Sequence, residues 1–437
     1  MEIGGLSWKN AVYIGGKTCY TSLWNHISRD REKIENWRYV FMNELRGACI
    51  IGQSGGPTSV INASAYGVIR TALDSGVITK VYGAAHGIKG VLNDQLYDMG
   101  QEDAEELELL LYTPSSALGS CRYKIADPDV DDTDYKRILE IFKKYDVRYF
   151  FYNGGNDSMD TCNKISKYMQ RVGYDCRVMG VPKTIDNDLF GTDHCHGYAS
   201  AAKYIATSCM EVYQDARVYD TGMICVIEIM GRHAGWLTAA AGLATAYGAG
   251  PDLIYMPETD FDMDKFIAEV KAVYEKNGNC MVAVSEGIHY ADGSPVADSG
   301  IVDGFGHKIP GGAAQTLSDM IMQETGLKSR SEKPGLLGRV SVALMSEVDQ
   351  REAEEAGAVA VRSAVEGKTG FMVGFQTTRE PEYRSETCLV PLEQVANAEK
   401  KFPLEWIGED GASIRPEFRD YCLPLLGAYD NRFAQLR

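Results

Sequence analysis

The segment from Gly180 to Asp188, GVPKTIDND, brings together three residues that could act on a phosphate. Lys183, Asp186 and Asp188 lie within six residues of one another. Carboxylates are ligands that Mg²⁺ accepts, and one carboxylate can also take the proton of a hydroxyl group. A lysine offsets the negative charge of a phosphate. The segment therefore indicates a site for Mg²⁺ and phosphate, because a solvated turn would hardly need the stiff Pro-Lys-Thr-Ile frame.

Two glycine-rich segments could bind an anion through the backbone. Gly52–Pro57 (GQSGGP) and Asn153–Ser158 (NGGNDS) each follow a short apolar run and precede a helical pattern. Glycine lets the backbone approach a ligand closely, and a helix start offers free N–H groups. The first segment also matches the G-x-S-x-G nucleophile elbow, but the sequence lacks the preceding strands that a hydrolase needs. An alternative for the second is that Asp157 or Ser158 only caps the helix.

Arginines near these segments are candidate ligands for phosphate or sugar oxygens. Arg232 lies in Ile229–Arg232 (IMGR), the segment that ends another apolar strand, and a guanidinium there can form paired hydrogen bonds. Arg122, Arg330 and Arg339 are further candidates. A single arginine is usually a solvated surface residue, so this interpretation depends on the neighbouring motifs.

Other classes of site are disfavoured. The sequence has neither a G-x-x-x-x-G-K-[ST] phosphate loop nor the protein-kinase motif set. Asp193–His196 (DHCH) contains metal-ligand residue types, but their spacing suits neither a helix face nor a zinc finger. The 11 cysteines form no C-x-x-C pair, which argues against a zinc ribbon or a disulfide framework and suits a reducing cytosol.

The charge and hydropathy of the chain limit its partners. Its 437 residues carry a formal net charge of −17, which disfavours nucleic acid. Its longest apolar stretch, Trp236–Tyr247, is too short to span a bilayer. We therefore expect a cytoplasmic protein with no nucleic-acid or membrane partner.

Short β-rich runs alternate with longer helical patterns after residue 46. This alternation predicts parallel sheets covered on both faces, in two α/β domains that share a cleft and change over near Gly191. In such folds ligands bind at the carboxyl ends of the strands. The predicted strands are 47–52, 79–84, 147–153, 176–181, 222–229, 252–256 and 280–285. The predicted helices are 58–75, 131–145, 157–172, 196–217, 235–248, 262–276 and 311–326.

The first 41 residues differ from the rest of the chain. They mix Trp, Tyr, Lys and Arg without a clear period, and they lack the features of a signal peptide. We hypothesise that Met42 is the natural start and that residues 1–41 are a translated leader. The alternative is a short helical extension that packs on a neighbour. Mass spectrometry of the natively expressed protein distinguishes the two, because an intact N-terminus at Met1 contradicts the leader.

Taken in order, six segments of the chain resemble the phosphofructokinase family. The resemblance runs from about Gly47 to at least Gly374. The T-I-D-N-D and M-G-R elements, in this order and at this distance, are highly specific. The matching segments are Gly52–Pro57, Leu118–Arg122, Gly154–Ser158, Pro182–Asp188, Ile229–Arg232 and Ser285–Gly287.

The resemblance implies an α/β fold of two Rossmann-like three-layer domains, with mostly parallel sheets facing a shared cleft. Residues 1–46 would be an N-terminal extension or leader. Residues 47–190 would bind the donor phosphate and Mg²⁺, completed by part of the C-terminal region. Residues 191–345 would bind the sugar phosphate, and residues 346–437 would pack back on both domains as helices and strands. A homodimer or homotetramer is expected.

The resemblance also implies roles for individual residues. Asp186 would be the general base for the C1 hydroxyl of fructose 6-phosphate, and Gly55 would offer its N–H to the donor phosphate. The catalytic residues would be Asp186, Lys183 and Arg122, and the Mg²⁺ ligands Asn156, Asp157 and Asp186. The donor phosphate would contact Gly55, Gly56, Arg122, Asn156, Asp157, Ser158 and Lys183. The sugar would contact Thr184, Ile185, Asp186, Asp188, Met230, Gly231, Arg232, Glu286, Arg330 and Arg339.

Asp157 and Lys183 favour pyrophosphate over ATP as the donor. Members of the family that use ATP commonly have Gly in place of Asp157, whose bulk and charge would lie where the α-phosphate and ribose of ATP bind. Lys183 can pair with a phosphate of pyrophosphate, the smaller donor. The phosphoryl transfer would be reversible. The alternatives are an ATP-dependent 6-phosphofructokinase and a non-catalytic regulator that binds a sugar phosphate or a nucleotide.

Three residues depart from the family pattern. Asn156 replaces a common metal-binding Asp, Met223 replaces an Arg that reaches a neighbouring subunit's sugar site, and Leu336 replaces a Tyr or His. An amide carbonyl can still bind Mg²⁺. These changes leave open a different acceptor, such as a seven-carbon sugar phosphate.

Overall fold

The structure, a computed structural model, describes residues 11–14, 17–20, 45–302, 308–396, 398–430 and 432–434. The chain divides into two units, Met1–Arg46 and Gly47–Arg437. In the first unit, β1 (Ala11–Ile14) and β2 (Lys17–Tyr20) pair as antiparallel strands. The leader hypothesis concerns residues 1–41, most of which lie outside the described residues, so it stays a prediction.

A seven-stranded sheet forms one half of the second unit, in the order β15-β14-β7-β6-β3-β4-β5. Its five central strands are parallel, and the edge strands β5 and β15 pair antiparallel with their neighbours. The strands are β3 (Gly47–Gln53), β4 (Ile78–Ala84), β5 (Leu96–Asp98), β6 (Val147–Gly154), β7 (Arg177–Pro182), β14 (Phe371–Thr378) and β15 (Arg384–Pro391).

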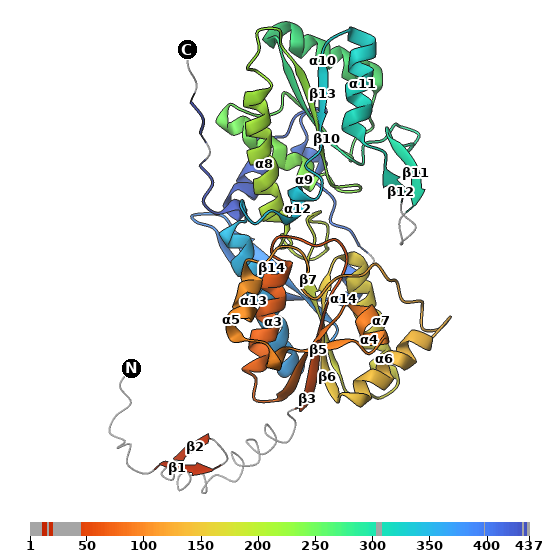
Figure 1. Ribbon diagram of the computed structural model, residues 1–437, viewed down its shortest axis with the longest axis vertical. Coiled ribbons are helices and arrows are strands. Elements are labelled where there is room, and N and C mark those ends of the chain that lie inside the picture. Colours follow the sequence, from red (N-terminus) through yellow and green to blue (C-terminus); the bar gives the residue numbers. More distant parts are fainter. Residues whose placement is uncertain are drawn as a thin grey trace. The chain divides into compact units, whose positions relative to one another are not determined.

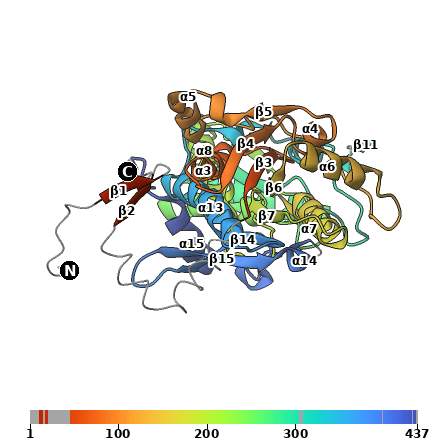
Figure 2. The same ribbon diagram turned by 90° about the horizontal axis from the view of Figure 1, so that it is seen from below.

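Helices cover both faces of this sheet, as Figure 2 shows. On one face, α3 (Ile61–Leu73) packs against α13 (Glu347–Val365). Their backbones approach so closely that a Cβ on Gly67 would lie 2.0 Å from the Glu354 carbonyl oxygen. On the other face lie α6 (Thr133–Lys144) and α7 (Asn156–Arg171), whose apolar residues share a core with Ile50, Phe150 and Val178.

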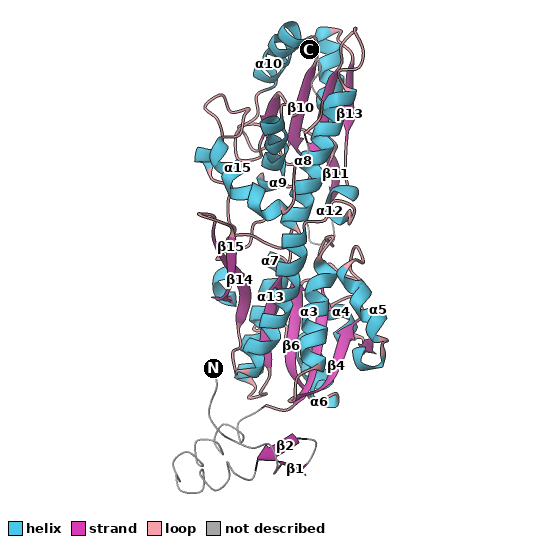
Figure 3. Cartoon of the chain, turned by 90° about the vertical axis from the view of Figure 1, so that its left-hand side faces the viewer, coloured by secondary structure: helices cyan, strands magenta, loops and turns pink. Residues whose placement is uncertain are grey.

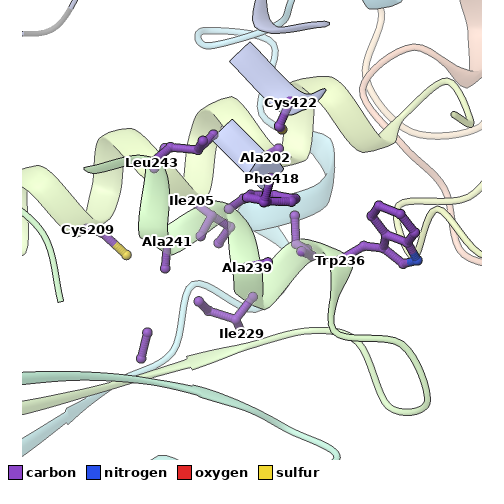
Figure 4. Packing of buried hydrophobic residues seen from close by; sticks show 14 of the residues in the cluster. Ala202, Ile205, Cys209, Ile229, Trp236, Ala239, Ala241, Leu243, Phe418 and Cys422 are labelled. Atoms are coloured by element: carbon purple, nitrogen blue, oxygen red, sulfur yellow. The ribbon is translucent and has the colours of Figure 1, made fainter. Parts of the chain in front are cut away.

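A parallel four-stranded sheet forms the other half, in the order β13-β8-β10-β9. Its strands are β8 (Ile224–Ile229), β9 (Leu253–Tyr255), β10 (Cys280–Ser285) and β13 (Ser329–Glu332). Alternate residues of β8 face opposite cores, because successive side chains of a strand point to opposite faces. Ile227 and Ile229 pack in one cluster with Trp236 and Phe418 (Figure 4), whereas Ile224 and Val226 pack in another.

The helices of this half form its outer layers (Figures 1 and 3). The longer ones are α8 (Tyr198–Asp215), α10 (Met263–Asn277) and α11 (Ala313–Thr325). The remaining elements are short: α4 (Ile88–Leu92), α5 (Ala104–Glu108), α9 (Trp236–Ala239), α12 (Leu337–Val340), α14 (Leu392–Val395), α15 (Pro416–Cys422), β11 (Asp298–Val302), β12 (Lys308–Pro310), η1 (Met99–Gln101), η2 (Leu109–Leu111), η3 (Ala240–Tyr247), η4 (Leu404–Trp406) and η5 (Leu423–Leu426).

The predicted fold class is confirmed, with two three-layer halves built on mostly parallel sheets. All seven predicted strands are present, with ends that differ by at most two residues. The helix predicted over 235–248 is only partly correct, because it is α-helical over Trp236–Ala239 and then narrows to a 3₁₀ helix. A Cβ on Gly242 in this stretch would lie 3.1 Å from the Ile414 Cβ, so close packing holds the segment.

The limits predicted for the domains at 190/191 and 345/346 stay predictions. Strands β14 and β15, at 371–391, return to the first sheet, while β8–β10 and β13 belong to the second. Within the described residues, no helix combines the length and apolarity that a bilayer crossing requires.

Candidate active site

A cavity of about 440 Å³ lies where strands of both sheets end. Loops after β3, β6 and β7 of the first sheet meet loops after β8 and β10 of the second, as expected for the carboxyl ends of parallel strands. The residues that line it are Gly55, Gly56, Pro57, Arg122, Gly155, Asn156, Asp157, Thr184, Ile185, Asp186, Asp188, Met230, Arg232, His233, Glu286, Arg339 and Glu399.

The loop after β3 forms one wall of the cavity. Gly55 has a φ of 77°, a left-handed conformation that glycine adopts without strain. Its N–H donates to the Cys121 carbonyl oxygen at 3.2 Å, so in this structure the amide is not directed to a donor phosphate. Thr58 and Ser59 do not cap the following helix, because α3 begins at Ile61 after Val60, without a side-chain cap.

Lys183 lies beneath this loop rather than on the cavity surface. Its side chain is 3% exposed, and its Nζ donates to the Gly56 carbonyl oxygen at 2.7 Å. Burial lowers the pKa of Lys183 to about 8, an effect that Asp186 opposes and that Arg339 reinforces. The Lys183 ammonium can therefore stabilise negative charge in the cavity from behind the loop after β3, to which it is hydrogen-bonded.

Asp186 and Asp188 follow β7 and project into the cavity. Burial raises the pKa of Asp186 to about 7, with added repulsion from Asp188 and Glu286. Lys183 and Arg232 lower its pKa, but desolvation outweighs them. Burial also raises the pKa of Asp188.

Asn156, the first residue of α7, pairs with Asp188 in the loop after β7. Its Nδ2 donates to the Asp188 Oδ2 at 2.7 Å. Its Oδ1 is buried and has no hydrogen-bond partner among the described residues. This oxygen is therefore an unsatisfied acceptor close to the carboxylates of the cavity.

Asp157, the second residue of α7, does not cap this helix. The cap residue of α7 is Gly155, and no side chain accepts a capping hydrogen bond there. The Asp157 side chain is 45% exposed, and its Oδ1 lies 3.9 Å from the Lys124 Nζ. The capping alternative is therefore wrong for Asp157, whose carboxylate remains at the cavity edge. Ser158 is buried and lies outside the lining residues.

The second sheet contributes the opposite wall. Met230 and Arg232 follow β8, Glu286 follows β10, and Arg339 belongs to α12. The Gly231 N–H donates to the Glu286 Oε1 at 3.4 Å, which places Gly231 behind the wall. Among the described residues, the Nε atoms of Arg232 and Arg339 are buried without a hydrogen-bond partner.

Most of the predicted site residues therefore meet in one cavity. Ser158, Lys183 and Gly231 lie just behind its surface, as described above. Arg330 does not join them: it is exposed on β13, opposite Cys225 near the start of β8. The prediction omitted four residues that line the cavity: Pro57, Gly155, His233 and Glu399. His233 could have been found because it adjoins Arg232, whereas no local signal marks Glu399.

His194 in the Asp193–His196 segment is a structural residue of the interior. Its Nδ1 lies 3.0 Å from the Asp193 Oδ1, and its Nε2 lies 2.6 Å from the Glu352 Oε2. In the part of the chain that the structure describes, no three His, Cys, Asp or Glu residues gather closely enough to hold a metal on their own. The described cysteines in this part of the chain are free.

Comparisons with known proteins agree with this geometry. The phosphofructokinase family model matches residues 48–364. The pyrophosphate–fructose 6-phosphate 1-phosphotransferase of Halomonas elongata is 43% identical over 382 residues, which cover 86% of this chain and 91% of that protein.

Two solved structures are similar over nearly their whole length. The pyrophosphate-dependent phosphofructokinase of Marinobacter aquaeolei has a TM-score of 0.79 at 38% identity, covering 88% of this chain and 92% of that one. The enzyme from Nitrosospira multiformis has a TM-score of 0.79 at 39% identity, covering 89% and 94%. The resemblance seen in the sequence is thus confirmed, and the chain belongs to the phosphofructokinase family of phosphotransferases.

Proposed function

We propose that this enzyme transfers a phosphoryl group from pyrophosphate to the C1 hydroxyl of fructose 6-phosphate, reversibly. The observation that carries the proposal is the meeting of Asp186 and Asp188 with Arg122, Arg232 and Arg339 around one cavity. A carboxylate base and several cations are what phosphoryl transfer requires, because positioning and electrostatic stabilisation supply most of its catalysis. The names of the relatives support the same donor and acceptor.

In the forward reaction, the C1 oxygen attacks one phosphorus atom of pyrophosphate. A C1–O–P bond forms, the bridging P–O bond breaks, and inorganic phosphate leaves. The hydroxyl proton passes to an oxygen of Asp186. A base with a pKa of about 7 suits this role, because it is partly ionised at neutral pH and still strong enough to accept the proton. Arg122 would stabilise the charge on the transferred group.

The residues at the cavity fit a Mg²⁺ cofactor. The buried, unpartnered Oδ1 of Asn156 and the carboxylates of Asp157 and Asp186 supply oxygen ligands. Mg²⁺ commonly takes one or two carboxylates and completes its shell with water and substrate phosphates. A three-carboxylate cage is therefore not required. When bound, the ion would neutralise phosphoryl oxygens.

Asp157 supports pyrophosphate rather than ATP. Its carboxylate is partly exposed at the cavity edge and is not used as a helix cap. A negative charge at this place would repel the extra phosphate of a nucleotide. Lys183, buried beneath the donor loop, would offset the charge of the smaller donor.

We also propose a homodimer or homotetramer in the cytoplasm. Arg330 is exposed on β13, away from the cavity of its own chain, so any contact with the sugar would be made in a neighbouring subunit. Leu336 and Leu337, 63% and 62% exposed, adjoin the same segment and could be covered by such a neighbour. Buried free thiols suit a reducing compartment.

The test is formation of fructose 1,6-bisphosphate from fructose 6-phosphate and Mg²⁺, with pyrophosphate in one reaction and ATP in another. Product with pyrophosphate alone is the expected result. Product with ATP alone would contradict the donor assignment. Absence of product from both reactions would favour a different acceptor or a non-catalytic regulator.

A further inference from the structure

Asn187, between the two catalytic-loop carboxylates, has an unusual backbone conformation. Its φ is 54°, in the left-handed region that residues other than glycine seldom adopt. Its side chain is 0% exposed. A strained residue persists when its surroundings over-determine it, and such residues concentrate at functional sites. The conformation sets the directions in which the side chains of Asp186 and Asp188 project from the backbone.

Three hydrogen bonds hold the Asn187 side chain. Its Nδ2 donates to the Tyr421 hydroxyl at 2.8 Å. Its Oδ1 accepts from the Cys195 N–H at 2.9 Å and from the Lys400 Nζ at 3.2 Å. The amide oxygen and nitrogen are thus both used, and the side chain has no freedom to turn toward the cavity.

The two C-terminal partners of Asn187 are themselves fixed. The Tyr421 hydroxyl donates to the Asp193 carbonyl oxygen at 2.8 Å, and the Lys400 Nζ donates to the same oxygen at 2.7 Å. The Lys400 N–H donates to the Asp188 carbonyl oxygen at 2.8 Å, so Lys400 also holds the loop 183–188 through its backbone. The Arg379 guanidinium lies 4.5 Å from the centre of the Tyr421 ring.

Both partners lie beyond the residues that the family model matches, which end at 364. Tyr421 is 234 residues from Asn187 along the chain, and Lys400 is 213 residues away. Neither side chain lines the cavity, so neither can touch a substrate there. Their contribution must pass through the loop that they hold.

We propose that Asn187 is a positioning residue, clamped by Tyr421 and Lys400, that directs the carboxylates of Asp186 and Asp188 for the transfer. The inference rests on the proposed function for its kinetic consequence. The C-terminal segment 398–422 is then a working part of the active site, although it supplies no group to the reaction.

Tyr421→Phe is the sharpest test, because it removes one oxygen atom and keeps the ring. Tyr383→Phe is its matched control: the Tyr383 hydroxyl donates to the Glu352 Oε1 at 2.8 Å in the same interior, without touching the loop. We expect kcat of Tyr421→Phe to fall about tenfold, because the variant loses the hydrogen bond from the Asn187 Nδ2 together with the one to the Asp193 carbonyl oxygen, with KM for both substrates within about twofold. Tyr383→Phe should keep kcat within about twofold. Equal kcat values in the two variants would overturn the proposal.

Asn187→Gly separates backbone conformation from side-chain bonding, because glycine adopts the left-handed conformation without strain. We expect this variant to lose at least as much kcat as Tyr421→Phe. Recovery of wild-type turnover would show that the conformation alone suffices, and it would overturn the clamp.

A substrate-free measurement keeps this inference distinct from the proposed function. Hydrogen–deuterium exchange in peptides covering residues 184–192, which exclude the His194 that pairs with Glu352, should be faster in Tyr421→Phe than in Tyr383→Phe, even if the wild-type enzyme uses another donor. Identical protection in the two variants would contradict the clamp. Absence of wild-type turnover with pyrophosphate would contradict only the proposed function.

Discussion

The two walls of the cavity are held in different ways. On the first-sheet side, hydrogen bonds to the protein interior hold the loop 183–188. Lys183 donates to the Gly56 carbonyl oxygen, and the Asn187 side chain forms three further bonds. On the second-sheet side, the Nε atoms of Arg232 and Arg339 are buried and unpartnered among the described residues. Unpaired buried donors are costly, so an anionic substrate would satisfy them. Under the proposed function, the groups that carry out the transfer would be preorganised, whereas those that bind the sugar would be completed by the substrate.

Asn156 is an exception among the described cavity-lining residues of the first-sheet side. Asn156 Oδ1 is buried without a partner, although its amide nitrogen is bonded to Asp188. This acceptor lies where we propose Mg²⁺. The comparison therefore predicts that changes to the first wall lower kcat, whereas changes to the second raise KM for the sugar.

Asp186→Asn should have the largest effect. Loss of the general base should lower kcat about 1,000-fold, because positioned bases contribute about 100- to 10,000-fold, while KM changes little. Steady-state kinetics with pyrophosphate measures both. Asp160→Asn is the control, since Asp160 pairs with Lys164 on α7 outside the cavity lining; it should stay within about twofold. An Asp186→Asn enzyme with near-normal turnover would refute the assignment.

Arg339→Met should act mainly on binding. Removing a charge-assisted hydrogen bond of about 1.5–3 kcal/mol should raise KM for fructose 6-phosphate about 10- to 150-fold, with a smaller change in kcat. Titrating the sugar at saturating pyrophosphate measures the effect. A large fall in kcat at unchanged KM would contradict the assignment of substrate binding to the second wall and of turnover to the first.

Arg330→Met is the comparison variant for Arg339. If the enzyme works as a closed oligomer with a shared sugar site, this substitution should also raise KM, despite the distance of Arg330 from its own cavity. Unchanged KM would show that Arg330 does not reach the sugar in any subunit.

Asp157→Gly should change the donor preference. Removing bulk and negative charge from the cavity edge should raise kcat/KM for ATP about tenfold or more and lower that for pyrophosphate. Both donors are assayed side by side at fixed sugar. Lys124→Met is the control, because an exposed ion pair contributes about 0–1 kcal/mol and its loss should barely change either donor. ATP turnover that stays undetectable would contradict the role of Asp157.

The pH dependence of turnover should show the smallest effect. Lys183 has a pKa lowered to about 8 by burial, and its protonated form is the one that would offset phosphate charge under the proposed function. Turnover should therefore fall as pH rises through about 8. Lys183→Arg retains its charge to high pH, so its alkaline limb should move upward. An alkaline limb at the same pH in both enzymes would assign it to another group, such as the donor itself.

Much of the fold was predictable from sequence because its signal is local. The apolar runs of β3, β6 and β8 and the loops after them are contiguous in the chain, and strand ends in a parallel sheet must meet. The sequence therefore placed Gly56, Asp186 and Arg232 at one cavity. It did not show that the Gly55 N–H is already bonded to Cys121.

The features of the fold and site that the sequence did not predict depend on contacts between distant parts of the chain. Glu399 reaches the cavity, and Tyr421 reaches Asn187, from a region with no motif of its own. The clamp needs the first half of the chain to be folded against segments more than 200 residues later. The periodicity of apolar residues in a short segment does not indicate such a long-range contact. The burial that raises the pKa of Asp186 is likewise a property of the assembled walls.

The most direct test of the central claim is the reverse reaction, followed by ³¹P NMR. The enzyme is incubated with fructose 1,6-bisphosphate, inorganic phosphate and Mg²⁺, without nucleotide. The account predicts that pyrophosphate and fructose 6-phosphate accumulate together in equal amounts, and that Asp186→Asn abolishes both signals. Fructose 6-phosphate without pyrophosphate, or no reaction in an enzyme that phosphorylates the sugar from ATP, would contradict it.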